Sequence, residues 1–367
     1  MGLFSNNDKT LLKTLQDVMR KSTFPSAIIP NVEAPLLSVM NLNRALIKKG
    51  CLQLDIEVQI PCLHQQLLWS DFFSALFTDV ADFESVDLSL SLTVKAINTS
   101  DKVPQIKQII LVASGKGGVG KSTTAANVAL ALSHAGANVG LLDADIYGPS
   151  LPTMLGVGDK KPVSNDGKLL EPIEAHGLFT MSLGFLVDEN DATVWRGPMA
   201  SRALSQLIFE TQWPKLDYLI VDMPPGTGDI QLTMSSAVPV SGAIVVTTPQ
   251  NLALKDAQKG ISMFNKVNVP VVGVIENMSF HECTNCGHHS HIFGQCGGET
   301  LATENQVPLL GQLPLNSDIG QDIDQGTPTL ISKPESTAAL AYLTIAQRCA
   351  INLNNTSLSI PSLIVGE

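Results

Sequence analysis

The feature that most constrains this chain of 367 residues is a glycine-rich run that follows a short apolar stretch. The run reads Ala113-Ser114-Gly115-Lys116-Gly117-Gly118-Val119-Gly120-Lys121-Ser122-Thr123 and fits the pattern Gly, four residues, Gly-Lys-Ser/Thr of a phosphate-binding loop. Residues 109–113 before it have the continuous apolar character of a buried parallel strand. Residues 124–135 after it have apolar residues at helical spacing. Strand, glycine turn and helix come in the required order, so we predict a nucleotide site.

The residue types in this loop suit a phosphate ligand. Its glycines leave backbone N–H groups free to converge on phosphate oxygens, and the start of the following helix adds partial positive charge. Lys121 is placed to reach the outer phosphates, and the Ser122 hydroxyl is placed to ligate Mg²⁺. Lys116 is an additional cation, and the residues alone leave open whether it stabilises charge during phosphoryl transfer or is a solvated lysine.

The length and the strand and helix patterns predict two domains. Residues 52–60 and 86–94 alternate strictly as half-buried strands do, and residues 8–21 and 67–80 are typical of helices. We therefore expect a small α+β domain over 1–97, a linker over 98–105, an ATPase domain over 106–352 and a flexible tail over 353–367.

In the second domain strands alternate with helices. Strands are predicted at residues 138–143, 216–222, 243–248 and 269–276, and helices at 198–211, 253–267 and 335–350. This alternation indicates an α/β fold with a mainly parallel sheet and helices on both faces. In such a fold the ligand lies at the carboxyl ends of the strands.

Acidic residues end two of these strands. Asp222 closes the strand at 216–222 and fits a carboxylate that holds Mg²⁺ through water. Of the pair Asp143 and Asp145, we favour Asp145 for orienting the attacking water, because Asp143 lies nearer the strand. The alternative for either is helix capping or a solvated loop.

Charge and hydropathy narrow the possible partners. The net charge of −11 argues against nucleic acid, which requires a basic face. No apolar run is long enough to cross a membrane, and the first residues lack the pattern of a secretory signal. Six cysteines without a signal favour metal or redox chemistry over structural disulfides. We expect a cytoplasmic protein.

The segment Cys283-Thr284-Asn285-Cys286, surrounded by histidines, has three interpretations. A redox dithiol would open a helix, which Gly287 disfavours. A zinc site needs four ligands, two of them from Cys296 and the histidines. Two copies of the chain would offer four thiolates, which a [4Fe–4S] cluster needs. The motif by itself does not separate zinc from iron–sulfur. Cys62, in the first domain, is best explained as a small buried residue.

Several segments together resemble a known family. The phosphate loop resembles that of the MinD/ParA-like ATPases with a deviant Walker A motif, and the chain over 106–350 is similar to the Mrp/ApbC family of iron–sulfur cluster carriers. Five further segments carry the likeness: Leu142-Asp143-Ala144-Asp145-Ile146-Tyr147-Gly148-Pro149-Ser150, Trp195-Arg196-Gly197-Pro198-Met199, Asp222-Met223-Pro224-Pro225-Gly226-Thr227-Gly228-Asp229, Glu276-Asn277-Met278-Ser279 and Cys283-Thr284-Asn285-Cys286-Gly287. The first domain is similar to the MIP18-like module that precedes the ATPase in many members.

This resemblance implies an ATPase that binds ATP and Mg²⁺ and carries a [4Fe–4S] cluster at a homodimer interface. It makes Lys116 the lysine that acts across the dimer, Cys283 and Cys286 the cluster ligands, and Asn277 a neighbour of the adenine. It implies apo iron–sulfur proteins and a cluster assembly scaffold as partners. Cys296 departs from the family pattern, which has a small residue there.

Other classes fit less well. A MinD/ParA-like positioning ATPase with a structural zinc site would require a basic amphipathic tail or a basic face. A GTP-dependent metallochaperone would require the guanine motif Asn-Lys-x-Asp, and Glu276-Asn277-Met278-Ser279 stands at that place.

Overall fold

The computed structural model describes residues 6–26, 28–30, 32, 34–97, 102–146, 148–165, 167–186, 197–228, 231, 238–283 and 285–359. The chain divides into two compact units. The smaller comprises Met1–Lys95 with His134–Gly136 and Ala350–Glu367, and the larger comprises Ala96–Ser133 and Ala137–Cys349.

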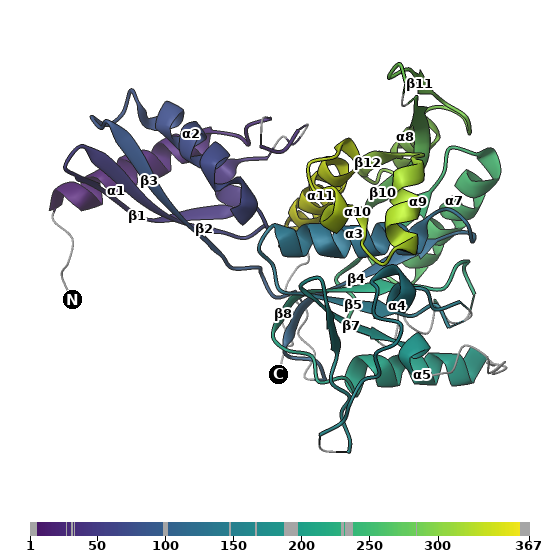
Figure 1. Cartoon of the computed structure of the whole chain (residues 1–367). Helices are drawn as coiled ribbons and strands as arrows, with labels where there is room; N and C mark the ends of the chain where they lie inside the picture. Colours follow the sequence, from purple (N-terminus) through teal and green to yellow (C-terminus); the bar gives the residue numbers. More distant parts are fainter. Residues whose placement is uncertain are drawn as a thin grey trace. The chain divides into compact units, whose positions relative to one another are not determined.

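The smaller unit has an α+β arrangement in which two helices pack on a three-stranded sheet (Figure 1). Strand β2 lies between β1, which is antiparallel to it, and β3, which is parallel. The elements are α1 (Asn6–Lys21), the 3-10 turn η1 (Leu36–Ser38), β1 (Met40–Lys48), β2 (Cys51–Val58), the 3-10 turn η2 (Leu63–Gln65), α2 (Gln66–Phe77) and β3 (Ser85–Leu92).

Side-chain periodicity explains this arrangement. Every second residue of β2 is buried, which is the alternation that its sequence predicts. On α2, Trp69, Phe73 and Phe77 are four residues apart and stack in succession, with ring centroids 5.7 Å apart in each pair. Strand β1 was not predicted, because its polar residues and a register shift between Leu42 and Arg44 break the alternation.

The larger unit is built on a nine-stranded sheet with the order β11-β10-β9-β4-β8-β5-β7-β6, and β12 also pairs with β10. All its strand pairs are parallel except β6–β7 and β10–β11. The strands are β4 (Ile106–Ser114), β5 (Val139–Asp143), β6 (Ile173–Ala175), β7 (Leu178–Ser182), β8 (Leu216–Asp222), β9 (Gly242–Thr247), β10 (Val271–Glu282), β11 (His289–Ser290) and β12 (Leu309–Pro314).

Helices pack on this sheet, with α3 and α11 on one side of β4, β5 and β8 and α5 on the other (Figure 1). The helices are α3 (Lys121–His134), α4 (Leu151–Met154), the 3-10 turn η3 (Leu183–Phe185), α5 (Gly197–Phe209), α7 (Asn251–Lys266), α8 (Gly297–Glu304), α9 (Ser317–Asp324), α10 (Thr329–Ser332) and α11 (Thr337–Ser359). The predicted α/β fold with a mainly parallel sheet, preceded by a small α+β region, is confirmed.

Two details differ from the prediction. Helix α11 continues to Ser359, so residues 353–359 are helical where a flexible tail was expected, and Leu353 and Asn354 are buried. Strands β6, β7, β11 and β12 were not predicted; β6 and β11 have only three and two residues, and β12 ends at a proline. Longer apolar strands such as β8, which is buried along its whole length, agree with their predicted ranges.

Candidate functional site

The phosphate loop connects the end of β4 to the start of α3. Two of its glycines are required by close packing. A Cβ on Gly115 would lie 2.2 Å from the backbone carbon of Asp256 in α7. Gly120 has a φ of +79°, and a Cβ there would lie 2.2 Å from Nδ2 of Asn277. The loop is therefore in direct contact with α7 and with β10, and these contacts exclude larger residues.

Lys121 lies at the first position of α3 and is only 6% exposed. Its Nζ is 2.5 Å from Oδ1 of Asp222 and 3.8 Å from Oδ2 of Asp145. It also donates a hydrogen bond to Oγ of Ser122 at 3.3 Å. The structure thus brings together four of the predicted residues, Lys121, Ser122, Asp145 and Asp222, at the carboxyl ends of β4, β5 and β8.

Asp143 serves local structure. Its Oδ1 accepts a hydrogen bond from the N–H of Asp145 at 3.0 Å. Its Oδ2 accepts from the N–H groups of Ser150 and Leu151 at 3.0 and 3.1 Å, at the start of α4. The carboxylate fixes the turn after β5, and Asp145 is the member of the pair that reaches Lys121.

Two buried carboxylates face one another across paired strand ends, because Asp143 of β5 is in register with Asp222 of β8. Burial, and then the charge of Asp222, raise the pKa of Asp143 to about 7. Burial also raises the pKa of Asp222, and the charge and hydrogen bond of Lys121 oppose this shift. Lys121 is thus the cation beside this buried acidic pair.

Lys116 and Asn277 contact residues of their own chain. Nζ of Lys116 donates to Oε1 of Gln250 at 3.4 Å, just before α7. Nδ2 of Asn277 donates to the carbonyl oxygen of Val119 at 2.8 Å, and its Oδ1 accepts from the N–H of Met278 at 2.9 Å. Asn277 therefore holds the phosphate loop, a contact that the sequence alone did not predict.

The Cys-x-x-Cys motif forms the tip of a hairpin between β10 and β11. Glu282 pairs with His289, and the N–H of Cys283 donates to the carbonyl oxygen of His288 at 3.0 Å. The N–H of Gly287, where φ is +70°, donates to the carbonyl oxygen of Cys283 at 2.8 Å. Figure 1 shows this hairpin, which we call the cysteine hairpin (residues 281–290), extending beyond the rest of the sheet.

The two thiols of the cysteine hairpin are accessible and one is activated. Cys286 is exposed and Cys283 partly so. The N–H groups of Asn285 and Cys286 donate to the sulfur of Cys283 and lower the pKa of its thiol. Cys62 is fully buried, and burial raises its pKa to about 12, as expected of a small core residue.

The nearby histidines do not complete a metal site. Nδ1 of His281 is 3.1 Å from the carbonyl oxygen of Leu315, and Nδ1 of His291 is 3.0 Å from that of Ser279. Within the described ranges, no group of three or more His, Cys, Asp or Glu side chains is placed to hold a metal ion. The described residues therefore do not bring together the four ligands of the zinc interpretation, and Cys296 lies apart at the start of α8.

Four of the segments that carried the family resemblance contain residues outside the described ranges. The residues concerned are Tyr147, Trp195, Arg196, Asp229 and Thr284. The structure places none of them, and Gly197 begins α5.

Two functional candidates were missed by sequence reasoning. Glu276 is fully buried, and its carboxylate accepts hydrogen bonds from Ser279 Oγ at 2.5 Å, Gln312 Nε2 at 2.9 Å and the N–H of Gly298. Gln250 contacts Lys116. An acidic residue inside an otherwise apolar strand was the available signal for Glu276.

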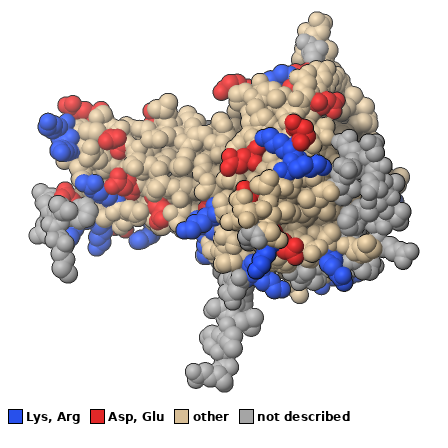
Figure 2. Space-filling view, turned by 60° about the horizontal axis from the view of Figure 1, so that its bottom comes forward, with Lys and Arg blue, Asp and Glu red and all other residues tan. Residues whose placement is uncertain are grey.

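Charged side chains of both signs are mixed on the surface. On the face shown in Figure 2, Lys and Arg side chains are interspersed with Asp and Glu, without a continuous basic area. Among the described residues, no helix is both long and apolar enough to cross a bilayer.

Known proteins resemble this chain over most of its length. Residues 105–350 match the family model ParA, described as NUBPL iron-transfer P-loop NTPase. An iron–sulfur cluster carrier protein of Escherichia coli strain K12 is 55% identical over 283 residues, which cover 76% of this chain and 77% of that protein. One of Haemophilus influenzae is 48% identical and covers 92% of both chains. The mouse iron–sulfur cluster transfer protein NUBPL is 48% identical over 68% of this chain and 79% of its own.

Solved structures show the same fold. A nucleotide-binding protein of Archaeoglobus fulgidus in complex with ADP is 34% identical, with a TM-score of 0.57 over 66% of this chain and 95% of that one. The cell division ATPase MinD of Pyrococcus furiosus, 24% identical with a TM-score of 0.51, shares the fold. From the match over 105–350 and from relatives about half identical over most of its length, this chain belongs to the iron-transfer P-loop NTPases, the family of the iron–sulfur cluster carrier proteins.

Proposed function

We propose that this protein binds a [4Fe–4S] cluster between two copies of itself and passes it to apoproteins, with ATP binding and slow hydrolysis controlling the transfer. The observation that carries the proposal is the cysteine hairpin, with two accessible thiols at its tip and no further ligand beside them in the described residues. A [4Fe–4S] cluster needs four thiolates, and two-fold pairing of Cys283 and Cys286 supplies four.

The arrangement of the thiols also suits release of the cluster to an acceptor protein. The N–H groups that point at the Cys283 sulfur favour the thiolate, which is the form that binds iron. Because Cys286 is exposed, an acceptor's thiols can approach the cluster and replace its ligands one at a time. The six cysteines are all free, as a reducing compartment requires, and we place the protein in the cytoplasm.

ATP is the proposed substrate of the loop. Lys121 and the loop N–H groups would bind the phosphates, with phosphate oxygens replacing Asp222 as the partner of Lys121. Asp145, which stands 3.8 Å from Lys121, would orient the attacking water. Lys116 would leave Gln250 and reach the phosphates of the partner copy, adding positive charge as an arginine finger does.

The residues present fit Mg²⁺. Oδ2 of Asp222 is buried and has no hydrogen-bond partner among the described residues, and the Ser122 hydroxyl lies beside Lys121. Hydroxyl and carboxylate oxygens are the ligands that Mg²⁺ prefers. When bound, the ion would neutralise charge on the transferred phosphoryl group.

Strand β10 supplies a physical link between nucleotide and cluster. Asn277 holds the phosphate loop, and the same strand ends at Glu282, the residue before Cys283. Between them Met278 has a φ of +55°, a strained conformation for a residue with a side chain. We propose that phosphate binding shifts Asn277 and that this bend transmits the shift to the cysteine hairpin.

Anaerobic reconstitution with iron and sulfide tests the proposal. Wild-type protein should acquire the absorbance of a [4Fe–4S] cluster and about two iron atoms per chain. Cys283→Ala and Cys286→Ala should retain almost none, while Cys296→Ser, an exposed cysteine outside the hairpin, should bind as wild type does. Equal iron in all four proteins, or a stable zinc site with one ion per chain, would refute it.

A further inference from the structure

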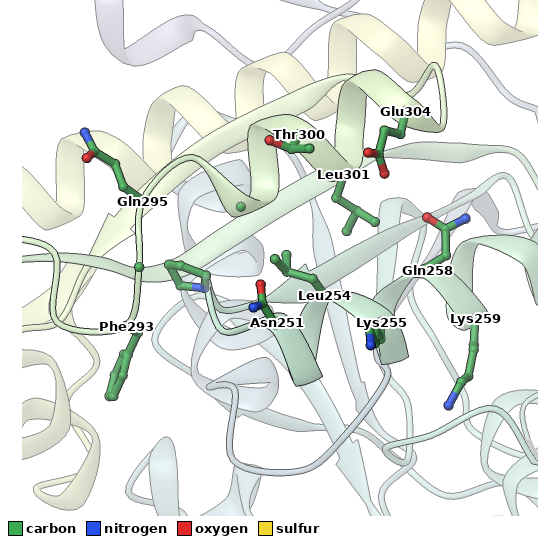
Figure 3. A pocket seen from close by; sticks show the side chains of 13 residues that line it. Asn251, Leu254, Lys255, Gln258, Lys259, Phe293, Gln295, Thr300, Leu301 and Glu304 are labelled. Carbon is green, nitrogen blue, oxygen red and sulfur yellow. The ribbon is translucent and has the colours of Figure 1, made fainter.

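A pocket of about 750 Å³ lies between α7 and α8 (Figure 3). Leu254 of α7 and Leu301 of α8 point toward each other across it and give it an apolar floor. Lys255 and Lys259 line it from α7, and Glu304 lines it from α8. The pocket is thus apolar at its base, with positive charge on one wall and negative charge on the other.

Specific contacts fix the distance between α7 and α8 at both ends of this pocket. At one end the side-chain amides of Gln258 and Asn305 exchange two hydrogen bonds of 2.6 Å, which tie α7 to the end of α8. At the other end Gly297 packs so tightly that a Cβ would lie 2.7 Å from Leu254 and 3.0 Å from the carbonyl oxygen of Pro249. The spacing of the two helices is therefore fixed, and the pocket is a built groove.

The groove is built from elements that adjoin both the phosphate loop and the cysteine hairpin. Helix α7 packs against the phosphate loop through Asp256 and Gly115. Residues 293–295 and Gly297 form another wall, and they belong to the segment by which the chain returns from the cysteine hairpin to α8. An occupant of the groove would contact the elements that hold the nucleotide and those that present the thiols.

Charge and apolar area indicate the chemistry of the occupant. Lys255 has no ion pair recorded within the described part of the chain, whereas Lys259 is 3.0 Å from Asp256. Lys255 is exposed, so its ammonium group is accessible to a carboxylate of an occupant.

We propose that this groove docks an extended acidic segment of the apoprotein that receives the cluster, an inference that rests on the proposed function. An apolar side chain of the segment packs between Leu254 and Leu301, and a carboxylate pairs with Lys255. Glu304 on the opposite wall repels that carboxylate and so fixes the direction of the segment. The client is thereby held beside the hairpin whose thiols it must replace.

The test compares two charge reversals on one helix. Lys255→Glu reverses a lining charge, and Lys266→Glu makes the same change at an exposed position of α7 outside the groove. Each protein is loaded with cluster, and transfer is followed to an apo-dehydratase that regains activity and, separately, to a small iron chelator. Lys255→Glu should raise the KM for the apo-dehydratase about fivefold and weaken its salt dependence, because a charge at the rim of an interface governs encounter. Transfer to the chelator and ATP hydrolysis should match those of Lys266→Glu.

Hydrogen exchange supplies a readout that needs no cluster. Adding the apo-dehydratase should protect amides within 251–259 and 293–304 in wild type and not in Lys255→Glu. Equal transfer by the two variants, or protection of these segments by ATP alone, which would mean that a second copy covers the groove, would overturn the inference. Failure of wild type to hold a cluster, with protection intact, would instead count against the proposed function.

Discussion

The nucleotide end of the larger unit and the cysteine hairpin differ in how complete they are. At the nucleotide end, Lys121, Asp143 and Asp222 are at most 6% exposed, and Lys121 forms an ion pair with Asp222. At the hairpin, Cys286 is exposed and the two thiols stand without further ligands in the described residues. The buried residues at the nucleotide end have partners within one chain, whereas the hairpin presents two accessible thiols, and we infer that a second copy supplies the remaining cluster ligands.

The largest expected effect comes from removing the Lys121 cation at the nucleotide end. Lys121→Ala should lower ATP hydrolysis about a hundredfold or more, because charge on the phosphates loses its main partner. The amount of iron bound after reconstitution should stay at the wild-type level, since the cysteine hairpin includes neither Lys121 nor the carboxylates around it. The control is Lys107→Ala, which removes a partly exposed ion pair with Asp217. Hydrolysis within a factor of two of wild type would contradict the assignment.

A glycine comparison tests how tightly the loop is built. Gly120→Ala forces a Cβ against Asn277 at a positive φ and should lower the free energy of unfolding by about 1–3 kcal/mol. Gly117→Ala, where a Cβ would meet nothing within 4 Å, should change it little. Denaturant titration without nucleotide measures both. Equal stability of the two variants would show that the contact between the loop and β10 is not as described.

The buried carboxylates predict a pH dependence. The pKa of Asp143 is about 7 in the folded chain against an ordinary value of 3.8, so the folded chain keeps a proton that the unfolded chain releases. This contribution to stability is fully present below about pH 4 and is lost as the pH rises through 7. Asp222→Asn removes the neighbouring charge and should make the decline between pH 5 and 8 shallower. Unfolding free energies of the two nucleotide-free proteins across that range provide the check, and parallel profiles would argue against the coupling.

The smallest effect concerns the bend between the two regions. Met278→Gly relieves the positive φ and should change the free energy of unfolding by less than about 1 kcal/mol. Because the bend becomes flexible, ATP should alter the rate of cluster release to a chelator less than in wild type. If ATP changes release equally in both proteins, the link through β10 is wrong.

How far the sequence predicts this molecule depends on the range of each interaction. The phosphate loop, long apolar strands such as β8 and the alternating β2 are local patterns, and they were predicted. The contact of Asn277 with Val119 joins residues 158 positions apart, and no local pattern signals it.

Other differences have the same cause. Helix α11 extends to Ser359 because Leu353 and Asn354 are buried by tertiary packing, although the asparagine-rich sequence favours a loop. The three interpretations of the cysteines differed only in what surrounds them in space. The fold shows that two of these histidines, His281 and His291, donate to backbone carbonyl oxygens, which composition does not reveal.

The most direct test of the account is the mass of the cluster-loaded protein under native conditions. Anaerobic native mass spectrometry of the reconstituted protein should show two chains carrying one [4Fe–4S] cluster, and Cys283→Ala should yield chains without it. A single chain that retains a whole cluster, or a dimer with one cluster in each chain, would contradict the claim that two hairpins complete one site.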